Sequence, residues 1–249
     1  MRSLKYKKRF EYVSQYYDQN YSGGEIDKEI KTVGKFLIKN TSGRVLDCGC
    51  GPVPQIWSIF MPKATEIRAI DLPQESVDFA IKKITNVQSW RREFAPYQKF
   101  VEDAISHPMK NYIVQQIKKI KEVKQADITK KLPYPENYFD TIISLYSLGV
   151  LRNENELEKA IKNINKMMKI GGKLLYVSTN GNNTNKTLPE YTWRGLTNVL
   201  VKVKKLLKKY GFLIKEIKIA KTNDDDNEMY KYNEIKMLSA VKIKSYLLK

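Results

Sequence analysis

Short apolar runs alternate with amphipathic segments along most of this chain. Three of the runs, Glu66–Ile70, Thr141–Leu145 and Leu174–Ser178, have the length and composition of buried parallel strands. The segments Glu154–Met168 and Leu196–Tyr210 carry apolar residues at the three- to four-residue spacing of a helix. Strands that alternate with helices predict an α/β fold with a parallel sheet.

The same patterns predict further elements at the two ends and in the middle of the chain. The segment through Asn40 is expected to form helices, and a second helical tract is expected at Asn111–Lys124. The glycine pair within 169–173 marks a helix stop before the next strand. Phe212–Lys221 and Glu234–Lys244 are predicted to be the last two strands.

The segment Val45–Pro52 joins a predicted strand to a turn of the kind that binds a ligand. Its sequence, VLDCGCGP, runs from apolar residues into Asp47 and then into Gly-x-Gly. Glycine lets the backbone approach a ligand closely, because it has no Cβ. The next strand ends in Asp71, where a carboxylate is well placed to accept hydrogen bonds from ribose hydroxyls. This pairing predicts a site for a cofactor that contains adenosine.

The turn itself distinguishes among adenosine cofactors. A dinucleotide-binding turn needs a third glycine, and none follows Gly51 at that spacing. The Gly-Lys-Ser/Thr of a triphosphate-binding loop is missing from the turn as well. Asp47 would repel a pyrophosphate but suits a cation, so the sequence favours S-adenosylmethionine, a sulfonium. The alternative is a dehydrogenase-like fold whose acidic residues are coincidental.

A third strand end follows at Asp127 and Ile128, and the succession from Tyr12 to the C-terminus resembles class I S-adenosylmethionine-dependent methyltransferases. The resemblance implies a Rossmann-like α/β fold: a seven-stranded, mostly parallel sheet with an antiparallel C-terminal hairpin and helices on both faces. Asp47 and the two glycines after it would line the methionine portion, and Asp71 the ribose. Asp127 and Ile128 would hold the adenine. The complete set of expected cofactor-binding residues is Tyr12, Tyr17, Asp47, Gly49, Gly51, Pro52, Asp71, Leu72, Ser76, Asp127, Ile128, Ser144 and Leu145.

A closer resemblance is to the small-molecule N-methyltransferases that act on nicotinamide, phenylethanolamine and indolethylamine. Tyr12–Tyr17 is similar to an N-terminal segment that lies over the cofactor in that group, and Asn233–Lys242 is similar to its last strand. The whole chain, 1–249, is therefore expected to be a single methyltransferase domain. Residues 1–40 would form an N-terminal helical lid, and 86–124 a helical insertion like that of the group.

The sequence departs from this group in the expected acceptor pocket. Members that handle amines have carboxylates at two positions, which fall at Gly149 and Ser178 in this chain. A buried cationic amine without a counter-charge is costly, so a neutral or anionic acceptor is expected. Tyr12 is the candidate catalytic residue, as a group that positions the acceptor, and packing of the lid is its alternative role. The candidate acceptor-binding residues are Tyr146, Gly149, Ser178, Tyr191, Thr192 and Trp193.

The charge of the chain allows a different interpretation. It has 45 Lys and Arg against 27 Asp and Glu, a formal net charge of +18. One interpretation is a basic surface that binds RNA, DNA or an anionic membrane. The other is that lysines cover solvated helix faces, as Lys202, Lys205 and Lys208 do opposite the apolar positions of Leu196–Tyr210. The spread of lysines along the whole chain favours the second interpretation.

Few other residues suggest a redox, catalytic or metal-binding role. The only two cysteines, Cys48 and Cys50, flank a glycine of the cofactor turn and are expected to be reduced thiols. The only histidine, His107, is expected in a surface turn, with catalysis as the alternative. The acidic triplet 224–226 is expected to face water, so no metal site is predicted.

These observations predict a cytoplasmic S-adenosylmethionine-dependent methyltransferase. It would transfer a methyl group to a small molecule, at nitrogen, by in-line displacement in an enclosed pocket, and release S-adenosylhomocysteine. The sequence has neither an apolar run long enough for a membrane span nor a secretory signal pattern, and we expect a monomer or homodimer. Two alternatives stay open: a nucleic-acid methyltransferase that uses the basic surface, and a non-catalytic regulatory subunit that binds the cofactor.

Overall fold

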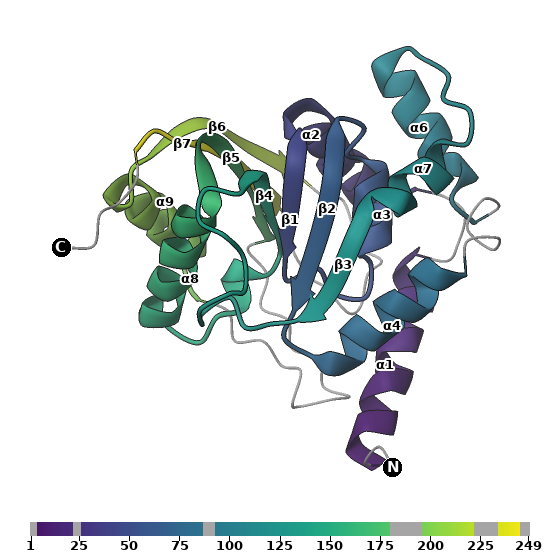
Figure 1. The fold of residues 1–249 in the computed structure, drawn as a ribbon, viewed down its shortest axis with the longest axis horizontal. Coiled ribbons are helices and arrows are strands. Elements are labelled where there is room, and N and C mark those ends of the chain that lie inside the picture. Colours follow the sequence, from purple (N-terminus) through teal and green to yellow (C-terminus); the bar gives the residue numbers. More distant parts are fainter. Residues whose placement is uncertain (1–3, 22–25, 87–92, 180–195, 222–233, 245–249) are drawn as a thin grey trace. The chain divides into compact units, whose positions relative to one another are not determined.

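The fold is known from a computed structural model, which consists of two compact units, Met1–Asp127 and Ile128–Lys249. Figure 1 shows the ribbon of the chain. The units are described in turn below as unit 1 and unit 2. The residues that the structure describes are 4–21, 26–86, 93–179, 196–221 and 234–244 of the 249-residue chain.

Unit 1 is built around three parallel strands with helices packed against them. β2 pairs with β1 on one side and with β3 on the other (Figure 1). Residues of both strand faces are buried, among them Val45, Leu46 and Ile70, as expected for a parallel sheet covered by helices. The elements of unit 1 are α1 Leu4–Tyr21, α2 Lys28–Asn40, β1 Gly43–Cys48, α3 Pro54–Ile59, β2 Ala64–Asp71, α4 Gln74–Thr85, α6 Ala95–Ile105, α7 Tyr112–Lys119 and β3 Ile120–Gln125.

The strand register of unit 1 brings two acidic strand ends to one edge of the sheet. Asp47 near the end of β1 is the partner of Ala69 on β2, and Asp71 at the end of β2 is the partner of Gln125 on β3. Parallel strands place their carboxyl ends at the same edge, which is where α/β proteins bind ligands. The predicted strand at Glu66–Ile70 is therefore confirmed, within a slightly longer β2.

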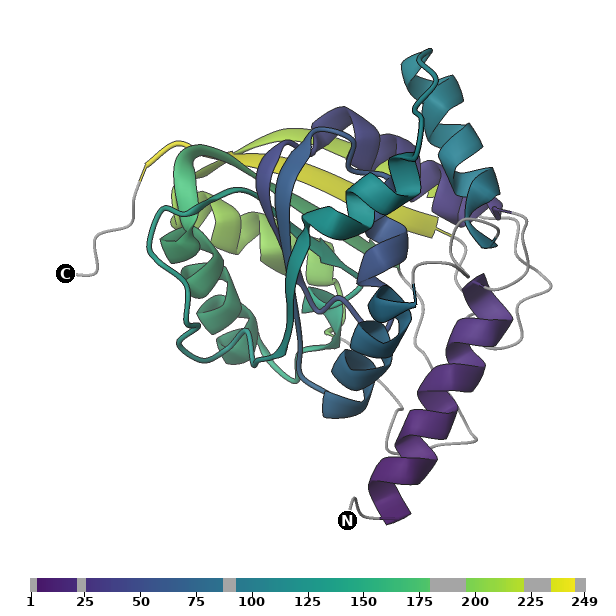
Figure 2. The same cartoon turned by 45° about the vertical axis from the view of Figure 1, so that its right-hand side comes forward.

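The N-terminal segment is helical, as predicted, and α1 packs along α4. The two helices run side by side in Figure 1 and in the turned view of Figure 2. Phe10 lies against the ring of Phe79 with centroids 5.8 Å apart, and Tyr17 lies against the same ring at 5.3 Å. An ion pair of 3.9 Å between Arg9 and Glu75 adds a polar contact between the helices. Aromatic packing of this kind fixes α1 on α4.

The predicted helix at Asn111–Lys124 is wrong in its second half. α7 ends at Lys119, and Ile120–Gln125 forms β3 instead. Ile120 and Val123 continue the apolar spacing of the helix, which is why the pattern indicates one. In the fold they pair with Ile67 and Ala69 of β2, so hydrogen bonding to a neighbouring strand overrides the local helical pattern.

Unit 2 contains four strands and two packed helices. β5 pairs in parallel with β4 and antiparallel with β7, and β6 is antiparallel to β7. Helix α9 contacts α8 and β6. The strand order of the seven-stranded sheet is β3-β2-β1-β4-β5-β7-β6, which confirms the mostly parallel sheet and the C-terminal hairpin. The elements of unit 2 are β4 Phe139–Leu145, a 3-10 turn Leu148–Val150, α8 Glu154–Met167, β5 Met168–Thr179, α9 Val199–Lys209, β6 Phe212–Lys221 and β7 Glu234–Lys242.

The glycine pair at 171–172 lies inside β5 and does not precede it, so the predicted start of the strand at Leu174 is wrong. β5 begins at Met168, directly after α8. Its pairing with β4 jumps from Phe139–Met168 to Thr141–Lys173, which makes residues 169–172 a bulge. Gly171 has a φ of 83°, a conformation that favours glycine. The glycines therefore allow the backbone conformation of the bulge.

Lys242 is a buried lysine at the end of β7, with 1% of its surface exposed. Its ammonium donates to the carbonyl oxygens of Asn165 at 2.7 Å and Met168 at 2.6 Å, and to the side-chain oxygen of Asn137 at 3.0 Å. Two of these acceptors lie at the C-terminal end of α8, where backbone carbonyls lack helical partners. Burial lowers the pKa of Lys242 from its ordinary value. The three hydrogen bonds compensate for the loss of water around the charge.

Replacing Lys242 with methionine should lower the free energy of unfolding by about 2 kcal/mol, because two buried carbonyl oxygens lose their donor. Urea denaturation followed by circular dichroism measures the change. Lys218→Met, an exposed position on β6, is the matched control and should change stability by less than about 0.5 kcal/mol. Equal stability of the two variants would show that the hydrogen bonds of Lys242 do not stabilise the fold.

Candidate cofactor site and acceptor residues

The turn after β1 is held against the end of β2 by backbone hydrogen bonds. The N–H groups of Gly49 and Cys50 donate to the carbonyl oxygen of Ile70 at 2.8 and 3.0 Å. Gly49 and Gly51 have φ values of 74° and 57°, which explains the Gly-x-Gly pattern. A Cβ at Gly51 would have no neighbour within 4 Å, so its glycine is required by the backbone conformation and leaves open space over the turn.

Asp71 closes this turn from the end of β2. One carboxylate oxygen accepts a hydrogen bond from the N–H of Gly51, and the other accepts from the N–H of Leu72 at 2.7 Å. Burial raises the pKa of Asp71 to about 6, and the two N–H donors oppose that shift. The carboxylate thus fixes the turn while part of its side chain stays exposed.

Asp47 is buried without a partner. Only 1% of its surface is exposed, and neither carboxylate oxygen accepts a hydrogen bond. Burial, and secondarily the charge of Asp71, raises the pKa of Asp47 well above its usual range. A buried carboxylate without donors is costly in the ligand-free protein. Its oxygens fit a ligand that brings hydrogen-bond donors or positive charge, as the methionine portion of S-adenosylmethionine does.

The two thiols of this turn are free, as predicted. Cys48 and Cys50 are both buried, and burial raises the pKa of each thiol well above its ordinary value. Neutral thiols of this kind are poor nucleophiles, so they line the turn as small apolar groups.

The other cofactor-binding candidates of unit 1 lie on separate elements. Pro52 and Ser76 are buried, and Leu72 is 57% exposed after the end of β2. Asp127 and Tyr12 are half-buried. The structure therefore brings together Asp47, Gly49, Gly51 and Asp71, whereas the cofactor role of the remaining candidates stays a prediction.

Tyr17 is fully buried and connects three helical segments of unit 1. Its hydroxyl donates to Glu93 at 2.5 Å, and the ammonium of Lys83 lies 3.9 Å from its ring centroid. Burial, together with Glu93, raises the pKa of Tyr17 above its ordinary value. Sequence patterns gave no reason to single out Glu93 or Lys83, because neither belongs to a motif and both are far from Tyr17 in the chain.

The candidates of unit 2 lie around the ends of β4 and β5. The hydroxyls of Ser144 and Ser147 are 2.7 Å apart. Tyr146 follows β4 with a φ of 61°, and its N–H donates to the carbonyl of Val177 at 2.9 Å. Ser178 is buried near the end of β5.

The other described candidates of unit 2 are Gly149, Leu145 and Ile128. The carbonyl oxygen of Gly149 accepts from the N–H of Leu196 at 3.0 Å. Leu145 is buried, and the carbonyl of Ile128 accepts from Asn163 at 2.7 Å. Three acceptor candidates, Tyr191, Thr192 and Trp193, and the acidic triplet 224–226 lie outside the described residues.

His107 lies after α6 beside a shallow, open pocket of the predicted insertion. The residue is exposed, and its backbone N–H donates to the backbone carbonyl of Glu102 at 3.1 Å. The described part of the chain holds no group of three or more His, Cys, Asp or Glu side chains arranged for a metal ion. A search of the same part of the chain found no helix long and apolar enough to cross a membrane.

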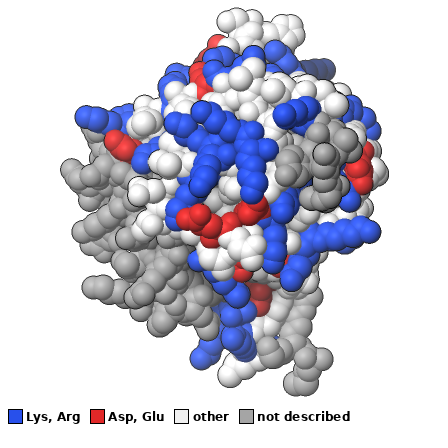
Figure 3. Space-filling model, turned by 90° about the vertical axis from the view of Figure 1, so that its left-hand side faces the viewer, with Lys and Arg blue, Asp and Glu red and all other residues white. Residues whose placement is uncertain are grey.

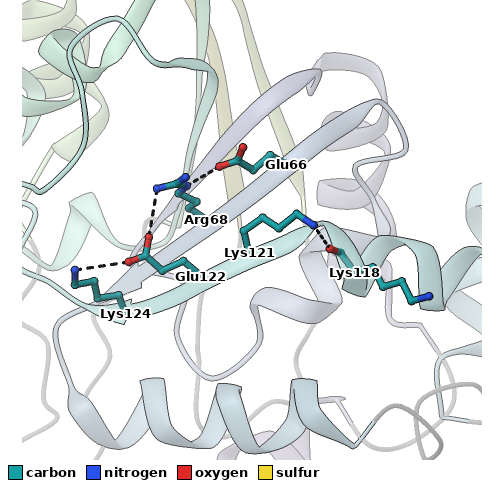
Figure 4. A network of polar contacts seen from close by, with 6 residues as sticks. All are labelled: Glu66, Arg68, Lys118, Lys121, Glu122 and Lys124. Atoms are coloured by element: carbon teal, nitrogen blue, oxygen red, sulfur yellow. Dashed lines mark hydrogen bonds and ion pairs between the residues drawn. The ribbon is translucent and has the colours of Figure 1, made fainter.

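Several of the basic residues are paired with acidic ones. Arg68 on β2 lies 2.6 Å from Glu66 and 3.6 Å from Glu122 on β3, and Lys124 lies 3.7 Å from Glu122 (Figure 4). In unit 2, ion pairs link Lys202 and Lys209 of α9 to Glu154 and Glu158 of α8 at 2.9 and 2.7 Å. On the face drawn in Figure 3, basic side chains gather around a group of acidic ones. The positive charge is thus locally compensated at several places.

Several solved structures with a similar fold are described as methyltransferases. A S-adenosylmethionine-dependent methyltransferase from Aquifex aeolicus superposes with a TM-score of 0.55 and 17% identity, over 94% of this chain and 97% of that one. The N-methyltransferase NodS from Bradyrhizobium japonicum WM9 gives 0.54 and 13%, over 88% and 99%. A chain from the complex of the Haloferax volcanii Trm112 methyltransferase activator with a putative methyltransferase gives 0.60 and 10%, over 98% and 100%.

The strand order and helices of this chain give it the Rossmann-like fold of class I S-adenosylmethionine-dependent methyltransferases. Within that class, the sequence matches the NNMT/PNMT/TEMT family over residues 1–243, so the chain belongs to this family. A search among curated proteins found no match. The family confirms the closer resemblance that the N-terminal segment and the last strand suggest.

Asp47→Asn should make the ligand-free protein more stable, by about 1–2 kcal/mol at pH 7, because it removes an ionisable group that is buried without donors. The same change should weaken S-adenosylmethionine binding more than tenfold, or about 1.4 kcal/mol. Thermal unfolding and titration calorimetry measure the two effects. Asp103→Asn, at an exposed position on α6, is the control. Lower stability of Asp47→Asn together with unchanged affinity for S-adenosylmethionine would show that Asp47 does not bind the cofactor.

Affinity for S-adenosylhomocysteine should fall about tenfold from pH 7 to pH 5. The pKa of Asp71 is about 6 in the free protein, so its carboxyl becomes protonated over this window and accepts ribose hydroxyls less well. Calorimetry across the pH range tests this. The Asp71→Ala variant should bind S-adenosylhomocysteine more than tenfold more weakly at pH 7. Its affinity should also depend less steeply on pH than that of the wild-type protein. An identical pH profile in this variant would remove Asp71 from the site.

Proposed function

We propose that this methyltransferase transfers the methyl group of S-adenosylmethionine to a neutral small molecule, at a nitrogen atom. Membership of the NNMT/PNMT/TEMT family is the observation that carries the proposal. The similarity of the fold to the N-methyltransferase NodS agrees with it. A small-molecule acceptor also suits a chain whose described helices and strands all belong to the methyltransferase fold, with no separate polymer-binding module among them.

The charge of the acceptor follows from two positions of unit 2. Where amine-handling members carry carboxylates, this chain has Gly149 and the buried Ser178. Neither residue is able to ionise, so neither supplies a counter-charge to a buried ammonium. A neutral nitrogen nucleophile also needs no base to free its lone pair. This is why we favour a neutral acceptor over a protonated amine.

The residues of the chain chiefly bind the cofactor and orient the acceptor. When bound, S-adenosylmethionine supplies an activated methyl group on a sulfonium. Asp47 would hold its methionine portion and Asp71 its ribose, and Tyr12 would position the acceptor. The helical segment 1–40 would act as a lid that excludes water, and its anchor on α4 through Tyr17 suits that role. We further propose that the chain is a single cytoplasmic methyltransferase domain.

A nucleic-acid acceptor is the second candidate, because the net charge is +18. A protein that binds RNA or DNA through lysines exposes them unpaired, and its affinity falls steeply with salt. The ion pairs on β2, β3 and α9 hold several basic side chains against carboxylates, where they are less available to contact phosphates. We therefore rank this function below the first.

The purified protein should be incubated with methyl-labelled S-adenosylmethionine and a whole-cell extract. Small molecules, lipids, nucleic acids and proteins are then separated and counted. We expect label among the small molecules, in compounds that are neutral at pH 7 before transfer. Asp71→Ala should lose at least nine-tenths of this label. Label confined to nucleic acid would overturn the small-molecule acceptor and show that the basic surface is functional.

A further inference from the structure

β6 is an edge strand of unit 2 that carries exposed apolar side chains. It pairs with β7 along one side, and no other strand within the described residues pairs with its second side. Leu213, Ile217 and Ile219 of this strand are 44%, 40% and 54% exposed. An edge strand presents backbone N–H and C=O groups that a further strand is able to bind, and exposed apolar residues strengthen such pairing.

The opposite edge strand, β3, has a different surface. Glu122 of β3 lies 3.6 Å from Arg68 and 3.7 Å from Lys124, so its charge is engaged within unit 1. The apolar residues of β3, Ile120 and Val123, are half-buried. β6 is therefore the edge at which a partner strand gains the larger apolar contact.

The pairing rules of antiparallel strands limit how two copies of β6 meet. Directly opposite residues either exchange both backbone hydrogen bonds or exchange none, and this property alternates along a strand. A strand that pairs with its own copy about a two-fold axis therefore has one residue opposite itself at the centre. β6 pairs regularly with β7 over residues 216–221, so the alternation holds in this part of the strand.

Ile217 is the central residue that the charges of β6 favour. With Ile217 opposite its copy, Glu216 of each chain lies opposite Lys218 of the other, which gives two pairs of opposite charge. Ile219 then reaches the copy of Ile217 along the diagonal, on the same face of the strands. A centre at Glu216 or Lys218 would place like charges opposite each other. A centre at Ile219 would place Lys218 opposite Ala220, without an ion pair.

We propose that β6 is a homodimer interface, at which two copies of this chain pair antiparallel about Ile217. The partner is a second copy because the strand complements itself, in charge and in apolar contact, at this one register. Lysines on an edge strand usually keep other strands away. At this register Lys218 meets a carboxylate, so the edge favours its own copy over other strands. The inference is independent of the methyl acceptor.

Sedimentation velocity of the full chain over a series of concentrations tests the proposal. Salt of about 0.15 M screens the repulsion between chains of net charge +18. The wild-type protein should shift from the mass of one chain toward that of two as its concentration rises. Glu216→Lys and Lys218→Glu each place like charges opposite each other, so each should weaken dimerisation at least about tenfold.

A mixture of these two variants tests the register directly. One chain then carries two lysines at the paired positions and the other carries two glutamates, so every opposite pair is again of opposite charge. The equimolar mixture should therefore form a dimer at concentrations where each variant alone is monomeric. A mixture that does not associate would overturn the proposed pairing.

Ile170→Lys is the matched control for Ile217→Lys. Both isoleucines are exposed, but Ile170 lies in the bulge of β5 and not on β6. Ile217→Lys should abolish the dimer, whereas Ile170→Lys should leave its dissociation constant unchanged. Circular dichroism checks that each variant is folded. If Glu216→Lys does not fold, Lys218→Glu and Ile217→Lys decide.

Two further outcomes would overturn the interface. One is a wild-type protein that stays monomeric at every concentration. The other is a dimer that persists in Ile217→Lys, because a different surface would then hold the two chains together. The labelling experiment tests the proposed function separately, and neither of its results changes the expected behaviour of β6.

Discussion

The placement of one carboxylate, Asp47, constrains the rest of unit 1. It is buried near the end of β1 with no donor to its oxygens, next to the second carboxylate of Asp71. Such an arrangement is costly, so the surrounding structure has to supply the compensating stability. It does so through an apolar parallel sheet, through the N–H bonds of the glycine turn to β2, and through the aromatic contacts of α1 with α4.

Polar groups that serve the fold and those reserved for ligands differ in one respect. Lys242 donates to three oxygens, and Tyr112 donates its hydroxyl to the carbonyl of Ile59 at 2.5 Å. Both are buried and fully occupied within their own units. Asp47 is equally buried, but neither of its carboxylate oxygens is hydrogen-bonded. Most buried polar groups in proteins have partners, so a buried carboxylate without one, beside the glycine turn, is a place where a ligand is expected to provide donors.

Several basic residues of the chain take part in local ion pairs. Lysines on α9 bind glutamates of α8, and charges of both signs alternate along β2 and β3 at the edge of the unit 1 sheet. Charged residues on an edge strand such as β3 also discourage pairing with other chains. Such ion pairs compensate charge locally, and the net charge of +18 is what remains after every acidic residue is counted.

The sequence alone determined the α/β alternation, the glycine turn and the acidic ends of β1 and β2, because these follow from local periodicity and from conformations that glycine favours. It misplaced Ile120–Gln125 and the start of β5, since strand pairing and a bulge depend on neighbours distant in the chain. Tertiary structure alone decided that Asp47 is buried without a hydrogen-bond partner, and that Glu93 reaches Tyr17. Hydrogen-bond satisfaction is a property of three-dimensional surroundings, which a single sequence does not contain.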